Sequence, residues 1–199
     1  RQLGGKEEDV PRLGEMVMAC TTTWMLIEPW DTMATGRFGG NGNCLGRSWC
    51  LLEVLYTVLA GNEFAVVMSE AEEARFLEAL EEDSDAAKNA FANLDVRKAE
   101  AFDPADKTRI DAEMEEKVGA LEVNTVVNRA MNVAMANVAL AAVRAGSLES
   151  ELALCTVVYL RDLGRLVEAR ELCEEVVETR AAKCEVDRGR EELQQIFCE

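Results

Sequence analysis

Proline is nearly absent from this sequence of 199 residues, and its distribution constrains the fold more than any other feature. The three prolines are Pro11, Pro29 and Pro104, so the whole stretch after Pro104 lacks the residue that most strongly breaks helices. That stretch is rich in Ala, Glu and Leu, which lose little side-chain freedom in a helix. Its expected breaks are the glycines at four positions: Gly119, Gly146, Gly164 and Gly189. The sequence therefore predicts antiparallel helices joined by short connections.

The part before Pro104 mixes helical and strand patterns. Apolar residues recur at helical spacing over 13–20, whereas 21–29 and 64–68 are short apolar runs of the kind that forms buried strands. Between the two strand runs, Ser48 is placed to cap a nearly continuous apolar helix that ends at Gly61. The order strand, helix, strand predicts a small α/β unit.

Further boundaries are marked by capping residues. Ser69, with Glu72 three residues later, forms the pattern of a capping box, and Asp103 precedes a proline at the first turn of the next helix. Leu94 and Val96 are expected to form a short strand between these two helices. The segment 31–46 has five glycines, which favours a loop over a regular element.

The predicted fold class is mostly α. We expect a partial α/β region over 1–110, because the strand-like runs stop there, followed by antiparallel helical hairpins over 111–199.

Charge is unevenly distributed along the chain. The formal net charge is -17, and most of the acidic surplus lies after residue 62. An acidic surface repels phosphate backbones and anionic lipid headgroups, so nucleic acid and membranes are not expected as partners. No uninterrupted apolar run reaches the roughly 18 residues of a membrane span. A protein or peptide partner, especially a basic one, fits this charge.

Seven cysteines and no histidine restrict the chemistry. The cysteines are odd in number and scattered, which indicates reduced thiols and a cytoplasmic protein. Cys44 and Cys50 could share zinc, but no second pair has the close spacing of a structural zinc site, so no metal is predicted. The absence of histidine excludes imidazole-based catalytic triads and metal sites.

The segment 150–183 resembles one tetratricopeptide repeat of the kinesin-light-chain type. In such repeats the first helix ends at a glycine, a hydrophobic residue follows two positions later, and a small residue lies where the helices cross. Gly164, Leu166 and Ala169 have these spacings, although the aromatic residue that often begins the pattern is absent. A plain helical hairpin is the alternative. The resemblance implies a surface that binds proteins, with exposed first-helix residues such as Glu151 and Arg161 near the contact.

A second resemblance covers about 21–68. A strand, a loop and a helix containing Ser48, Trp49, Cys50 and Glu53 resemble the central part of a Toll/interleukin-receptor (TIR) domain. In NAD-cleaving members the glutamate of this motif lies in the active site, which makes Glu53 a catalytic candidate. Under the same resemblance Trp30, Ser48 and Trp49 are candidates for a ligand-binding wall. The alternatives are tryptophans that belong to the core and a glutamate that orders the glycine-rich segment.

Together the two regions are similar to a group of algal and oomycete proteins with a divergent TIR-like region before kinesin-light-chain-like repeats. The leading hypothesis is a noncatalytic protein–protein interaction scaffold that requires no cofactor. The alternative is an NAD glycohydrolase that uses Glu53, with repeats that control self-association. A third hypothesis is a fragment without an autonomous activity.

Overall fold

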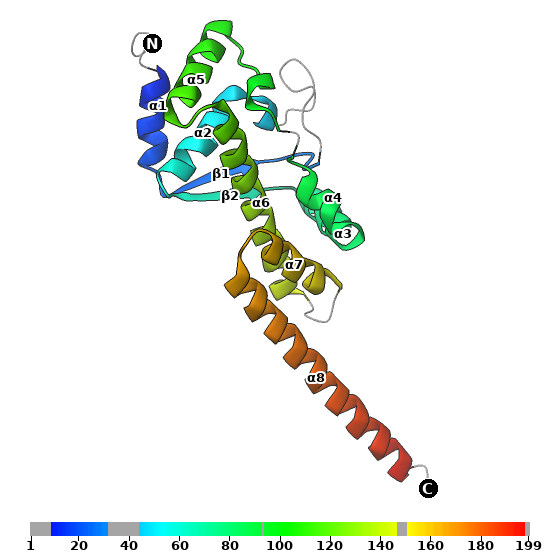
Figure 1. Ribbon diagram of the computed structural model, residues 1–199. Coiled ribbons are helices and arrows are strands. Elements are labelled where there is room, and N and C mark those ends of the chain that lie inside the picture. The colour runs from blue at the N-terminus through cyan, green and yellow to red at the C-terminus, as the bar shows by residue number, and fades with distance from the viewer. Residues whose placement is uncertain (1–8, 32–43, 93, 147–150, 198–199) are drawn as a thin grey trace.

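The computed structural model describes residues 9–31, 44–92, 94–146 and 151–197 (Figure 1). In this part of the chain the structure is mostly helical, as predicted, with one two-stranded sheet. The elements are α1 (Asp9–Met18), β1 (Thr22–Leu26), the 3-10 helix η1 (Cys44–Gly46), α2 (Ser48–Leu59), β2 (Glu63–Val67), α3 (Glu70–Glu82), α4 (Ser84–Asn89), the 3-10 helix η2 (Val96–Lys98), α5 (Pro104–Lys117), α6 (Ala120–Ala145), α7 (Glu151–Asp162) and α8 (Leu166–Phe197).

The two predicted strands pair in parallel, and α2 connects them. Met25 on β1 and Phe64 and Val66 on β2 are buried, on the face of the sheet opposite to Trp24. Both strands contact α2, and β2 also contacts α6. The sequence prediction of a strand, helix and strand unit is therefore confirmed over 22–67.

The other face of the sheet is apolar and exposed. Trp24 is 73% exposed, Leu26 is 59% exposed and Val67 is 41% exposed, and the strand register places Leu26 opposite Val67. Helices usually cover both faces of a parallel sheet. In the described part of this chain only one face is covered.

Helix α2 begins where the sequence predicted but for a different reason. Its N-cap is Arg47, with no side-chain capping bond, so the prediction that Ser48 caps the helix is wrong. The backbone N–H of Ser48 donates instead to the carbonyl oxygen of Glu100 at 2.9 Å. A backbone carbonyl from a segment distant in the sequence thus bonds the start of α2 in place of a side-chain cap. Gly61, with φ of +70°, follows the C-terminal end of the helix as predicted.

The capping box at α3 is half formed. The Ser69 hydroxyl accepts from the backbone N–H of Glu72 at 3.4 Å, which confirms the cap. The Glu72 carboxylate does not return the bond to Ser69. It is buried and accepts from the backbone N–H of Trp30 at 3.0 Å and from Arg75 at 2.6 Å. Glu72 therefore connects α3 to the segment after β1.

The predicted strand at Leu94 and Val96 is wrong, because Leu94 belongs to no regular element and Val96 begins the 3-10 helix η2. The Asp95 carboxylate accepts from the backbone N–H of Arg97 at 3.2 Å, a local bond that turns the chain out of the extended conformation. Asp103 caps α5 by accepting from Ala105 at 2.9 Å, as predicted.

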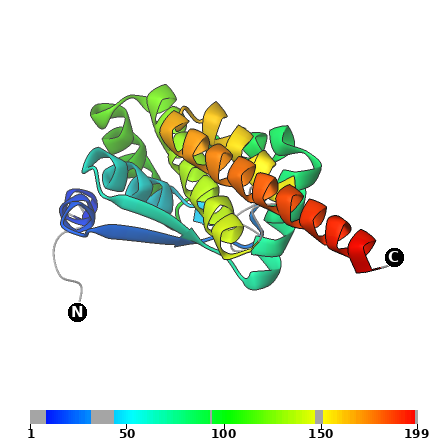
Figure 2. The same ribbon diagram turned by 90° about the horizontal axis from the view of Figure 1, so that it is seen from below.

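Three of the four predicted helix breaks are confirmed, at Gly119, Gly146 and Gly164. The fourth, near Gly189, is wrong because α8 is continuous from Leu166 to Phe197. Figures 1 and 2 show α8 extending away from the rest of the structure. An isolated glycine weakens a helix without ending it.

Helix α6 is central to the packing and contacts α2, β2, η2, α5 and α7. Buried residues on both sides of position 110 form one continuous core, so the described residues pack together across the predicted division at 110/111. Over Leu121–Ala145, α6 is long and apolar enough to cross a membrane, with a mean hydropathy of 1.4. Half of the most apolar window is buried in the structure, and the core helix of a soluble protein has the same property.

Candidate functional site

The TIR-like motif lies in the first half of α2. Glu53 is half-buried, and burial raises its pKa although the nearby charge of Arg47 acts in the opposite direction. Glu53 lines neither of the two cavities described below. Glu53 is therefore a carboxylate in a partly dry environment, outside both of these cavities.

The predicted ligand-wall residues do not share an open surface. Trp30 is 5% exposed and packs edge-to-face against Phe76, with ring centroids 5.2 Å apart, so it belongs to the core. Ser48 is buried, with no hydrogen-bond partner for its hydroxyl oxygen among the described residues, and Trp49 is half-buried. The core interpretation of Trp30 matches its burial.

Helices α7 and α8 form a hairpin about Gly164, whose φ is +77°. The N–H of Gly164 donates to the carbonyl of Arg161 and the N–H of Arg165 donates to the carbonyl of Leu160, both at 2.9 Å. This pair of bonds is the Schellman motif of a helix end. A reversal of the chain at Gly164 was predictable from the sequence.

The other two predicted packing residues differ in burial. Ala169 is 5% exposed and packs in the core, whereas Leu166 is 63% exposed. Leu166 is the first residue of α8 and therefore precedes the turn that contributes Ala169 to the core. Of the repeat-packing residues that the resemblance named, Ala169 is thus buried and Leu166 is mostly exposed.

The two predicted protein-binding residues lie at opposite ends of α7. Glu151 is its exposed first residue. Arg161 lies in its last turn, and its side chain bonds to Asp162 at 2.8 Å. Of the two, Arg161 lies beside the larger cavity because Asp162 is one of the residues that line it.

A cavity of about 550 Å³ lies between α6, the end of α7 and the turn before η2. We call it the asparagine-lined groove, because three asparagines of α6 form part of its wall. Its lining residues are Ala92, Leu94, Asn124, Thr125, Asn128, Arg129, Asn132, Asp162 and Leu163. The groove thus lies where the segment before η2 meets α6 and the end of α7.

Sequence reasoning missed this groove, although its signal is visible. Asn124, Asn128 and Asn132 are four residues apart, and this spacing places them on one face of a helix. An amide on the buried side of an apolar helix requires hydrogen-bond partners. The periodic asparagines in α6 therefore mark a polar strip on an otherwise apolar helix.

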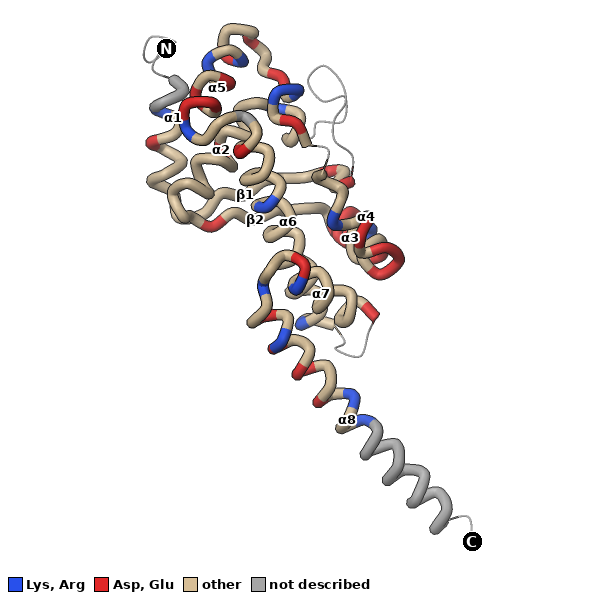
Figure 3. Tube along the Cα trace, in the orientation of Figure 1, with Lys and Arg blue, Asp and Glu red and all other residues tan. Residues whose placement is uncertain are grey.

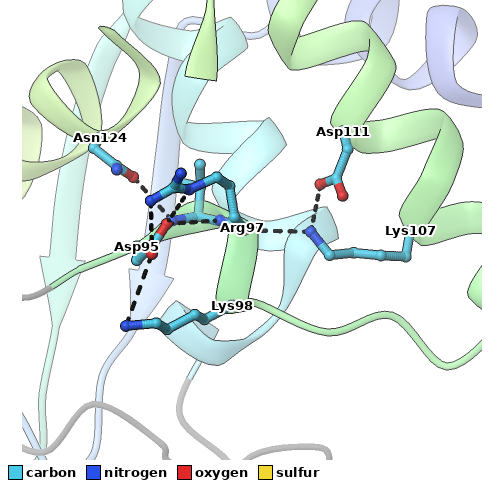
Figure 4. Close-up of polar contacts among 7 residues, drawn as sticks. Asp95, Arg97, Lys98, Lys107, Asp111 and Asn124 are labelled. Carbon is cyan, nitrogen blue, oxygen red and sulfur yellow. Dashed lines mark hydrogen bonds and ion pairs between the residues drawn. The ribbon is translucent and has the colours of Figure 1, made fainter. Parts of the chain in front are cut away.

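The side-chain oxygens of these three asparagines all accept hydrogen bonds. The Asn132 Nδ2 donates to the Oδ1 of Asn128 at 3.0 Å, and the Tyr159 hydroxyl of α7 donates to the Oδ1 of Asn132 at 2.9 Å. The Oδ1 of Asn124 accepts from the backbone N–H of Val96 at 2.9 Å, as Figure 4 shows. The acceptor groups of the three asparagines are thus used inside the protein.

Donor groups remain available in the groove. Among the described residues, the Nδ2 of Asn128 donates no hydrogen bond and the Arg129 guanidinium has no ion pair. The negative charge of Asp162 is already balanced, since Lys88 and then Arg161 hold the pKa of its carboxyl below the ordinary value. The groove therefore offers donors and one unpaired cation to a ligand.

A second cavity of about 350 Å³ lies beside η2 and includes Arg97, Lys98 and Lys107. Its cations have partners: Arg97 holds the pKa of Asp95 at about 2, and Lys107 pairs with Asp111 (Figure 4). These ion pairs leave less capacity for a charged ligand here than in the asparagine-lined groove.

The described residues contain no group of three or more Cys, Asp or Glu side chains that could hold a metal ion. Comparisons with known proteins give no further assignment: no family model matches the chain, and neither a curated protein nor a solved structure matches it.

Proposed function

We propose that the protein is a noncatalytic cytoplasmic scaffold that binds an extended peptide segment of a partner protein in the asparagine-lined groove. The observation that carries this proposal is the pair of available donors, Asn128 Nδ2 and the Arg129 guanidinium, in a cavity of about 550 Å³. Support for the cytoplasm comes from the described cysteines, all of which are free thiols.

The chemistry of the groove suits a peptide. An extended peptide presents a row of carbonyl oxygens, which accept from amide and guanidinium donors. Asn132 and Asn124 are fixed by Tyr159 and Val96, so part of the polar wall is already ordered before a ligand binds. Preorganised donors lower the entropic cost of binding.

The net charge of the chain and the charge inside the groove favour different groups on the partner. The net charge of -17 favours a basic partner at long range, and acidic residues gather along α3 (Figure 3). Among the described residues that line the groove, however, Arg129 is the charged residue without an ion pair. We therefore propose a basic partner protein whose bound segment places a carboxylate against Arg129.

Peptide selection from a random display library tests this proposal with the full chain. Selected peptides are expected to carry Asp, Glu or a free C-terminal carboxylate, and to lose at least about tenfold in affinity with Arg129→Glu. Arg170→Glu is a matched control, because Arg170 is exposed on α8 outside the groove. Peptides that bind the two variants and the parent chain equally would contradict the proposal.

The alternative, an NAD glycohydrolase, is favoured by one observation, the raised pKa of Glu53. A carboxylate of this kind would stabilise an oxocarbenium-like state near the bond to nicotinamide. Incubation of the chain with NAD, beside Glu53→Ala, separates the alternatives. A nicotinamide release rate that depends on Glu53 supports the enzyme, and equal background rates exclude it.

A further inference from the structure

The uncovered face of the sheet carries a continuous apolar strip. On β1, Trp24 and Leu26 alternate with the buried Met25, and on β2 the small Ala65 pairs with Trp24 and Val67 with Leu26. We call this strip the Trp24 face. Figure 2 shows β1 on the outside of the molecule. Contiguous exposed apolar surface of this kind marks an interaction site in a soluble protein.

Carboxylates lie at both ends of the Trp24 face. At one end the Oε2 of Glu63 accepts from the Thr22 hydroxyl at 3.1 Å, and at the other the Oε1 of Glu28 accepts from the Ser69 hydroxyl at 3.2 Å. Both glutamates are exposed, and within the described part of the chain neither forms an ion pair. The apolar strip therefore lies between two negative groups that can accept from a cation.

The separation of the two carboxylates matches the length of a short helix. Glu63 pairs with Thr22 in the strand register, and Glu28 lies six residues after Thr22, which corresponds to about 20 Å of extended chain. Two lysines about 14 residues apart span this distance on one face of a helix. A helix is also the element that normally covers a face of a parallel sheet.

A second copy of this chain is a poor match for the same face. In a face-to-face dimer the glutamates of one copy would meet those of the other, and the net charge of -17 on each chain adds to the repulsion. The exposed apolar side chains present a few hundred Å², less than the roughly 800 Å² per partner that a standard interface buries. A single basic helix satisfies both the charge and the area.

We infer that the Trp24 face binds an amphipathic α-helix of a partner protein, in which an apolar stripe lies between basic residues at the two ends. The stripe covers Trp24, Leu26 and Val67, and the basic ends pair with Glu28 and Glu63. This site goes beyond the proposed function, because none of these residues lines the asparagine-lined groove.

A synthetic peptide tests the inference with the full chain. The fluorescent peptide is a designed helix with a leucine stripe and lysines about 14 residues apart on the same face. Its binding is followed by fluorescence anisotropy and should weaken as salt is added. The same peptide with glutamates in place of the lysines should bind at least about tenfold more weakly.

Substitutions in the protein assign the binding to the Trp24 face. Trp24→Ser should lower the affinity for the lysine peptide at least about tenfold, because tryptophans dominate the energy of such contacts. Val177→Ser is the matched control, since Val177 is 60% exposed on α8. Glu63→Lys should weaken the lysine peptide and strengthen the glutamate peptide, whereas Glu178→Lys, on the exposed surface of α8, should change neither. Such an exchange of preference does not arise from misfolding.

The remaining outcomes overturn the inference. It fails if the lysine peptide does not bind, if Trp24→Ser and Val177→Ser bind it equally, or if Glu63→Lys does not change the preference. It also fails if sedimentation shows a dimer of the parent chain that Trp24→Ser abolishes, because a second copy then covers the face. Arg129→Glu should bind the lysine peptide unchanged, so the Trp24 face and the groove are tested separately; a loss in this variant would place the peptide in the groove and overturn the inference.

Discussion

The hydroxyl of Tyr159 donates a buried hydrogen bond of 2.9 Å to the Oδ1 of Asn132. This bond joins α7 to the wall of the asparagine-lined groove. Because Asn132 in turn donates to Asn128, the position of α7 and the orientation of the groove amides are connected. The groove should therefore respond to a change at Tyr159, which is not one of the residues that line it.

Tyr159→Phe should destabilise the protein by about 1 to 3 kcal/mol, because the buried Oδ1 of Asn132 loses its donor from α7. Urea unfolding followed by circular dichroism measures this loss. Tyr56→Phe is a suitable control, since Tyr56 donates to Glu113 away from the groove. Weaker peptide binding in Tyr159→Phe alone is expected, and equal weakening in both variants would show that only global stability matters.

The protein should lose stability at alkaline pH because of the buried phenol of Tyr159. Burial raises the pKa of its phenol above the ordinary value of 10.0. The folded state therefore keeps a proton that the unfolded chain loses, so this contribution is present below pH 10 and is lost as pH rises through the folded pKa. Unfolding free energies measured from neutral pH to above pH 10 should fall less steeply in Tyr159→Phe than in the parent chain.

Neighbouring residues on β1 should differ sharply in their effect on stability. Met25 is 6% exposed and faces the core, whereas Trp24 is 73% exposed on the uncovered face. Met25→Ala is expected to cost about 2 to 5 kcal/mol, and Trp24→Ser should change stability by about 0.5 kcal/mol or less. Thermal melts of the two variants provide the comparison. A large loss in Trp24→Ser would mean that another surface covers this face.

The features predicted correctly from the sequence are those whose hydrogen-bond partners lie close together in the sequence. The caps at Ser69 and Asp103 use side-chain bonds to residues two or three positions away, so sequence alone contains both partners. Gly164 is similar, because its positive φ and both bonds of its turn lie within five residues. These features were predicted correctly.

Long-range contacts explain what the sequence did not predict. The start of α2 depends on Glu100, more than 50 residues from Ser48, and no periodicity indicates that bond. The groove likewise requires Asn132 of α6 to meet Tyr159 of α7. The spacing of the asparagines was visible, but only the packing of α6 shows that their oxygens are used and that the Asn128 donor is available.

Replacing Gly164 should lower the stability of the protein because of the backbone conformation at this position alone. An added Cβ would meet no atom within 4 Å, but a φ of +77° strains an L-residue. Gly164→Ala is therefore expected to cost about 1 to 2 kcal/mol, and Gly164→Asn less, because asparagine tolerates this region better. Chemical denaturation of the two variants measures the difference. Equal losses would indicate that the hairpin turn adopts another conformation.

Glu53→Gln should stabilise the protein at neutral pH if its carboxylate has no ligand. Burial raises the pKa of Glu53, so ionisation is less favourable in the folded chain than in the unfolded chain. The resulting penalty is absent below the unfolded pKa, near the ordinary value of 4.5, and grows as pH rises through the folded pKa. The neutral glutamine avoids it, so the gain in unfolding free energy should appear near pH 7 and vanish in acid. A loss of stability at neutral pH would instead show that the ionised carboxylate makes a favourable contact, as an ion pair with Arg47 would provide.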